Sequence, residues 1–188
     1  AYTLLLYGAF GGALFLLPFL LLRVHRYDPA AAGAALLPLS VGLAVLSPLA
    51  GRLAAKVGAR VQLVAGPLLV AAGFALMAWR ADVANYWTGA FPGLAVLALG
   101  LGVAVAPLTD AVLGAVRDEY EGAASGINNA VARVAGLLAV ALVGFVLASS
   151  DAAAILAGYR TALLAAAAVA IGASVIAALT VREEPLAG

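Results

Sequence analysis

Six apolar stretches fill almost the whole chain and are separated by short charged connectors. They cover residues 1–24, 30–50, 61–79, 89–114, 122–148 and 159–181. A hydrocarbon core about 30 Å thick needs roughly 20 helical residues to cross it. The stretches show no alternation with a period of two residues, so we expect helices rather than barrel strands. The pattern therefore predicts an all-α membrane protein with six transmembrane helices.

Composition agrees with this prediction and excludes several functions. Apolar residues make up 66% of the chain and charged residues 10%, against roughly 45–50% apolar residues in soluble domains. The net charge of +1 gives no reason to expect a nucleic-acid partner. There is no cysteine, and no phosphate-binding loop, metal cluster or nucleophile with a base is recognisable. We expect membrane lipid as the surroundings, no cofactor and no enzymatic activity.

Charge in the connectors predicts the orientation. Residues 51–60 carry Arg52, Lys56 and Arg60 with no acid, so the positive-inside rule places them in the cytoplasm. The tail at 182–188 then also faces the cytoplasm, and 25–29, 80–88 and 149–158 face outward. An aromatic belt is expected at the outer interface, formed by Tyr27, Trp79, Tyr86, Trp87 and Tyr159.

An internal repeat divides the chain into units of about 1–80 and 88–181. The pairs Gly11 and Gly100, and Pro18 and Pro107, share one offset along the sequence. A repeat of three spans has an odd number of crossings, so its second copy must be inverted. Inverted three-span repeats are typical of secondary transporters. Pro18 and Pro107 are expected to bend the first helix of each unit.

A polar stripe on the fifth span is the strongest local signal. Ser125, Asn129 and Arg133 recur every four residues and so share one helix face. An arginine in the middle of a span costs about 2.5–3.5 kcal/mol on insertion scales, which makes it a functional candidate. We expect Arg133 to approach Asp110 near the cytoplasmic end of the fourth span, through Asn128 or Asn129. The alternative is an interhelical clamp that fixes packing.

Aromatic side chains in the first span suggest a second part of the site. Tyr7 and Phe10 lie at helical spacing and are candidates for lining an apolar cavity that receives a lipophilic ligand. Contact with lipid or with neighbouring helices remains the alternative.

Two segments carry a resemblance to a known family. Residues 51–60 (GRLAAKVGAR) resemble the Gly-x-Leu-x-Asp-Arg-x-Gly-x-Arg loop of the major facilitator superfamily, and they lie between the second and third spans, where that family has its loop. Residues 122–129 (GAASGINN), followed by Arg133, resemble the fifth span of a C-terminal half in the fourteen-span drug:proton antiporters. The loop residues that carry the likeness are Gly51, Arg52, Lys56, Gly58 and Arg60.

The resemblance implies that this chain is the C-terminal six-helix half of a multidrug exporter in a bacterial plasma membrane. Its partners would be an N-terminal half of six or eight helices, a small lipophilic or cationic substrate, and protons. Spans one, two, four and five would line the cavity. Ala55 replaces the acid of the loop, which removes one partner of the family's charge lock.

Two other functions stay open at this point. The bundle is also compatible with a membrane anchor or interaction domain that transports nothing, and with a half-size transporter that works as a homodimer. The chain opens on Ala1 rather than on methionine, so we expect it to be processed or cropped.

Overall fold

The computed structural model describes residues 2–114, 116–147 and 151–181, apart from the side chains of 13, 53–57, 110, 118 and 145–147. Six of its helices are long and apolar enough to cross a membrane. The elements are α1 (Tyr2–Arg23), α2 (Pro29–Ala34), α3 (Leu37–Val57), α4 (Ala59–Trp79), α5 (Ala90–Leu113), the 3₁₀ turn η1 (Asp118–Tyr120), α6 (Glu121–Leu147) and α7 (Ala152–Thr180). The prediction of six transmembrane helices is confirmed.

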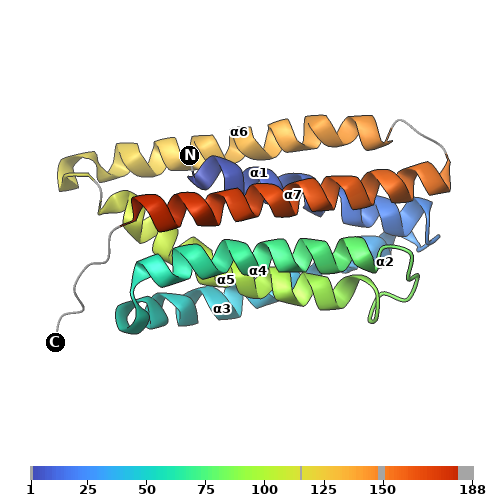
Figure 1. Cartoon of the computed structure of the whole chain (residues 1–188), viewed down its shortest axis with the longest axis horizontal. Helices are drawn as coiled ribbons and strands as arrows, with labels where there is room; N and C mark the ends of the chain where they lie inside the picture. The colour runs from blue at the N-terminus through green and yellow to red at the C-terminus, as the bar shows by residue number, and fades with distance from the viewer. Residues whose placement is uncertain (1, 115, 148–150, 182–188) are drawn as a thin grey trace.

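The long helices lie side by side and alternate in direction (Figure 1). The start of α1, the connections from α3 to α4 and from α5 to α6, and the end of α7 share one end of the bundle. We call this the signature end, because it contains the turn between α3 and α4, and the opposite end the distal end. In Figure 1, α6, α1 and α7 occupy the upper part and α4, α5 and α3 the lower part.

Helix packing relates the two three-helix units to each other. The first helix of each unit packs on the second and third helices of the other unit: α1 on α6 and α7, and α5 on α3 and α4. The third helices, α4 and α7, pack on one another. Exchanging the two units leaves this set of pairs unchanged, and the units run in opposite directions (Figure 1). The bundle is thus built as two inverted repeats.

Two predicted connectors, 51–60 and 149–158, are longer than the observed ones. The expected connector at 51–60 is mostly helical, since α3 continues to Val57 and α4 begins at Ala59. Only Gly58 separates them, with a φ of 85° that favours glycine. The expected outer connector at 149–158 is likewise helical from Ala152, where the Asp151 side chain accepts a hydrogen bond from the Ala154 amide at 3.0 Å. Hydropathy misses the polar turns that continue α3 to Val57, whereas residues 152–158 (AAAILAG) are apolar and the start of α7 is set by the Asp151 cap.

Glycines bring α4 and α5 into backbone contact. A Cβ added to Gly66 would lie 2.6 Å from the Ala104 Cβ, and one added to Gly100 would lie 2.6 Å from the Val70 nitrogen. Helices in lipid lack a hydrophobic force between them, so close approach of small residues supplies much of their association. This pair is therefore the tightly packed part of the bundle.

Polar contacts join the connectors at the distal end. The Tyr27 hydroxyl donates to the Ala84 carbonyl oxygen at 2.9 Å and accepts from the Tyr86 amide at 3.0 Å. The Tyr86 hydroxyl donates to the Ala35 carbonyl oxygen at 2.8 Å, and burial raises the pKa of this phenol, which favours the donating form. The predicted aromatic belt is wrong for Tyr159, which is only 1% exposed, whereas Trp79 and Trp87 are exposed.

Candidate substrate and gating site

The polar stripe lies on α6, and its deepest member has no hydrogen-bond or ion-pair partner among the described side chains. Arg133 is about 18 Å from the start of the helix at ~1.5 Å per residue. Asn129 and Arg133 are exposed, whereas Ser125 is half-buried. Among the described side chains, neither Asn129 nor Arg133 makes a hydrogen bond or an ion pair. The stripe is thus an open polar surface in the middle of a membrane-spanning helix.

Asn128 has a different role from its neighbour. Its Oδ1 accepts a hydrogen bond of 2.7 Å from the hydroxyl of Thr3, which is 8% exposed. This contact joins α6 to α1, as an interhelical clamp would. The predicted route from Arg133 through Asn128 or Asn129 to Asp110 stays a prediction. The Asp110 side chain itself lies outside the described residues.

The two sides of α6 differ in chemistry. Arg133 lies about 180° around the helix from Leu142, at 3.6 residues per turn. Leu138 and Leu142 line an apolar groove toward α7, which Arg133 does not touch. The polar stripe and the groove therefore belong to separate surfaces of one helix.

The aromatic side chains of α1 that were predicted to line a cavity mostly pack against neighbouring helices. Tyr7 and Phe10 are half-buried against the hydrophobic core. Neither lines the groove between α6 and α7. Tyr2 crosses the bundle, and its hydroxyl donates to the Leu63 carbonyl oxygen on α4 at 3.1 Å.

Pro18 and Pro107 lie inside continuous helices, α1 and α5. Pro107 is buried and Pro18 is half-buried. Each proline leaves the carbonyl four residues earlier without its helical N–H. Pro48 and Pro67 lie inside α3 and α4 as well, so proline alone does not set the first helices apart.

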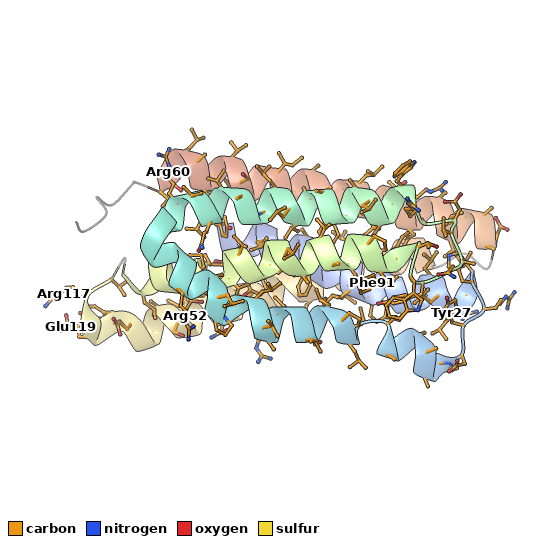
Figure 2. The ribbon with its side chains drawn as sticks, turned by 90° about the horizontal axis from the view of Figure 1, so that it is seen from below. Tyr27, Arg52, Arg60, Phe91, Arg117 and Glu119 are labelled. Atoms are coloured by element: carbon orange, nitrogen blue, oxygen red, sulfur yellow. The ribbon has the colours of Figure 1, made fainter. Side chains whose placement is uncertain are left out.

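The signature segment forms a turn with two differently placed arginines. Arg60 donates from Nη2 to the Ala178 carbonyl oxygen at 2.9 Å, in the last turn of α7. Cations are favoured there because the carbonyl end of a helix carries partial negative charge. Arg52 is exposed on the α3 side of this end (Figure 2). A Cβ added to Gly51 would meet no described atom within 4 Å. The Lys56 side chain lies outside the described residues.

Sequence reasoning missed Gln62, which is 2% exposed in α4. Its Nε2 donates to the Ala50 carbonyl oxygen of α3 at 3.0 Å, across the Gly58 turn, while its Oε1 has no hydrogen-bond partner in the described part of the chain. The one available signal in the sequence was a single glutamine at the start of the apolar stretch 61–79. It also missed Thr3, because a threonine near the start of an apolar span is unremarkable without its partner.

Six antiparallel spans in two inverted units, with an open polar stripe on one span, define an integral membrane bundle of the transporter type. Residues 1–188 match the pattern of the Major Facilitator Superfamily, and the chain belongs to that superfamily. Members of this family are transporters rather than enzymes.

Several named resistance proteins are similar to the chain. The multidrug resistance protein Stp of Mycobacterium tuberculosis is 31% identical over 138 residues, which is 73% of this chain. A puromycin resistance protein of Streptomyces alboniger is 35% identical over 149 residues, or 78% of the chain. A tetracenomycin C resistance and export protein of Streptomyces glaucescens is 31% identical over 146 residues, or 75%. The matched stretches make up 25%, 29% and 26% of these relatives, so the chain corresponds to about a quarter of each.

Proposed function

We propose that this chain is the C-terminal six-helix half of a drug exporter in a bacterial plasma membrane. The exporter moves small lipophilic or cationic compounds by alternating access, coupled to proton influx. The names of the similar proteins, which refer to multidrug, puromycin and tetracenomycin C resistance, support the substrate class. The partner is an N-terminal half of six or eight helices, which rocks against this one around a central cavity.

The proposal depends mainly on one observation: Arg133 is exposed in the middle of α6. Exposure of Arg133 to lipid would cost about 2.5–3.5 kcal/mol, and no described side chain offsets this charge. A water-filled cavity or a polar partner half removes most of that cost. We therefore assign Asn129 and Arg133 to the cavity wall or the cytoplasmic gate.

The basic residues at the signature end divide into two roles. Arg60 is bonded to the end of α7, so it holds this bundle together. Arg52 is exposed and remains available for a contact with the other half. We propose that this contact, with its neighbour Lys56, stabilises the outward-open state. This assignment also places the signature end in the cytoplasm.

The test compares two arginine variants of the full-length transporter. Arg133→Ala removes the charge in the middle of α6, whereas Arg117→Ala removes an exposed charge at the signature end, where Arg117 pairs with Glu119 at 3.1 Å (Figure 2). We expect at least tenfold slower drug efflux from cells for Arg133→Ala and unchanged efflux for Arg117→Ala, at equal amounts in the membrane. Normal efflux by Arg133→Ala would assign the stripe to packing instead.

Proton coupling needs a separate measurement. The full-length protein is reconstituted into proteoliposomes that contain a pH indicator. When a substrate drug added outside enters the vesicles, protons should leave and the internal pH should rise. Drug movement with no change in internal pH would contradict coupling while leaving export intact.

A further inference from the structure

The carbonyl that Pro67 leaves without a helical partner receives a hydrogen bond from another helix. Pro67 lies inside α4 and has no N–H, so the carbonyl of Leu63, four residues earlier, loses its helical donor. The Tyr2 hydroxyl of α1 donates to this carbonyl oxygen at 3.1 Å. Leu63 is 2% exposed and Pro67 is buried, so bulk water does not reach this part of the α4 backbone. The hydroxyl therefore supplies the hydrogen bond that Pro67 removes from α4.

This contact joins two helices that pack mainly on other partners. The main partners of α1 are α6 and α7, and those of α4 are α5 and α7. The three other prolines inside spans differ from Pro67. The carbonyls that they leave without a helical donor accept no hydrogen bond from any described side chain: Leu14, Ala44 and Val103. The bond from Tyr2 is thus particular to α4, the helix that takes part in the tight glycine contacts.

The next carbonyl of α4 shows why the bond to Leu63 matters more than an ordinary contact. The carbonyl oxygen of Val64 accepts a hydrogen bond of 2.9 Å from Ser174 Oγ of α7, but it also has the N–H of Leu68 as its helical donor. Loss of the Ser174 hydroxyl therefore leaves Val64 bonded within its helix. Loss of the Tyr2 hydroxyl leaves the Leu63 carbonyl with no donor, which is costly where no water is present.

The residue after Tyr2 connects α1 to the polar stripe. Thr3 donates to Asn128 Oδ1 of α6 at 2.7 Å, and Asn128 directly precedes Asn129. Neighbouring residues point about 100° apart around a helix, so Tyr2 and Thr3 reach different helices. The start of α1 is thereby bonded to α4 by one residue and to α6 by the next.

We propose that Tyr2 is a positioning residue for the polar stripe. Its bond to the Leu63 carbonyl fixes the start of α1 to α4, and Thr3 transmits this position to Asn128 and so to the start of α6. The bond persists because Pro67 leaves the carbonyl no donor within α4. The arrangement belongs to the bundle itself, so the proposal does not rest on drug export.

A double-mutant cycle tests the bond in the purified full-length protein. Tyr2→Phe keeps the ring and removes the hydroxyl, and the unfolding equilibrium constant from titration with SDS should rise about tenfold. Pro67→Ala restores the N–H that the Leu63 carbonyl lacks, so in this background Tyr2→Phe should raise the constant less than about threefold. Equal effects of Tyr2→Phe in both backgrounds would overturn the proposal.

Ser174→Ala is the matched control, because it also removes a hydroxyl that donates to an α4 carbonyl. It should change the unfolding constant by the same small factor in both backgrounds. Should Tyr2→Phe alone fail to fold, recovery of folded protein on adding Pro67→Ala would support the proposal, and failure to recover it would contradict it. Pro67→Ser restores the same N–H and serves if Pro67→Ala does not fold.

A second measurement separates positioning of the stripe from general stability. Asn129→Cys is labelled with a membrane-impermeant thiol reagent in inside-out vesicles, and its rate reports access of water to the stripe. Tyr2→Phe should raise this rate at least threefold, and adding Pro67→Ala should return it to within twofold of the starting value. Ser174→Ala should leave the rate unchanged. An unchanged or lower rate in Tyr2→Phe would overturn the positioning role.

Discussion

The α4–α5 pair and the α7–α1 pair occupy equivalent places in the two inverted units, yet they are packed differently. Along α4 and α5, glycines at 66, 73, 93 and 100 meet backbone or Cβ atoms of the facing helix at distances that leave no room for a Cβ. Along α7, an added Cβ at Gly172 would meet nothing within 4 Å, and Gly158 lines the groove. One pair is closed by backbone contact and the other borders an open space.

This difference shows that the two copies of a repeated unit can be packed differently. The α4–α5 side has the close small-residue contacts that hold helices together in lipid. The α1 side leaves α6 with two open surfaces, one polar at Arg133 and one apolar at Leu142. The α4–α5 side is therefore the more rigid one, and the predictions below test this contrast.

The largest effect is expected at the close contact between α4 and α5. Gly100→Ala places a Cβ 2.6 Å from the Val70 nitrogen and 2.7 Å from the Gly66 carbonyl oxygen, so backbone must move. Such overpacking costs about 1–3 kcal/mol. Thermal unfolding of the purified full-length protein should show a clear loss of stability for Gly100→Ala.

Gly172→Ala is the control for this prediction, because its Cβ would meet nothing within 4 Å. Both changes add the same helix propensity, so the difference between them reports the contact. Equal stability of the two variants would remove the contrast between the two sides.

The second prediction concerns the two surfaces of α6. This chain contains no cysteine. The reaction rate of a single introduced cysteine can therefore be measured without background, once any cysteines in the rest of the transporter are replaced. Asn129→Cys should react at least tenfold faster than Leu142→Cys with a membrane-impermeant thiol reagent, because only water supports formation of the reactive thiolate. The rates are measured in inside-out vesicles, so that the reagent reaches the cytoplasmic side on which the signature end is proposed to lie. Similar rates at both positions would mean that α6 does not separate water from lipid.

The smallest effect is expected for the clamp between α1 and α6. Thr3→Val keeps the side-chain shape and removes the hydrogen bond to Asn128, which should cost about 0.6 kcal/mol, the average for such bonds in membranes. Thr161→Val is the matched control, since the Thr161 hydroxyl bonds within its own helix. Denaturant titrations of both variants measure the difference. A loss of several kcal/mol for Thr3→Val would mean that α1 and α6 are joined as firmly as α4 and α5.

The fold could be predicted largely because bilayer length constrains apolar runs so strongly. The end of α3 and the start of α7 could not, because a helix continues wherever its backbone can bond, and the turn at Gly58 depends on one glycine with positive φ. The family resemblance identified residues 51–60 as one signature loop. It did not separate Arg60, which caps α7, from Arg52, which is exposed.

The site was predictable only as a helix face. Periodicity placed Asn129 and Arg133 together, since it depends on local geometry alone. The partner of Asn128 proved to be Thr3, far away in the sequence, because the repeats exchange helices and bring α1 beside α6. The groove was not foreseeable, because it arises from distances between helices that alanine and glycine leave unfilled.

The exchange of helices between the units also determines the order of assembly during synthesis. The main packing partners of α1 are α6 and α7, which the ribosome produces after α3, α4 and α5. Gly11 and Gly136 are about 125 residues apart in the chain, so at roughly 5–20 residues per second the first span waits about 6–25 s for its partner. During that interval its glycine face lies bare in the bilayer. The glycine face of α1 thus stays without its partner until the fifth span of this bundle has been made.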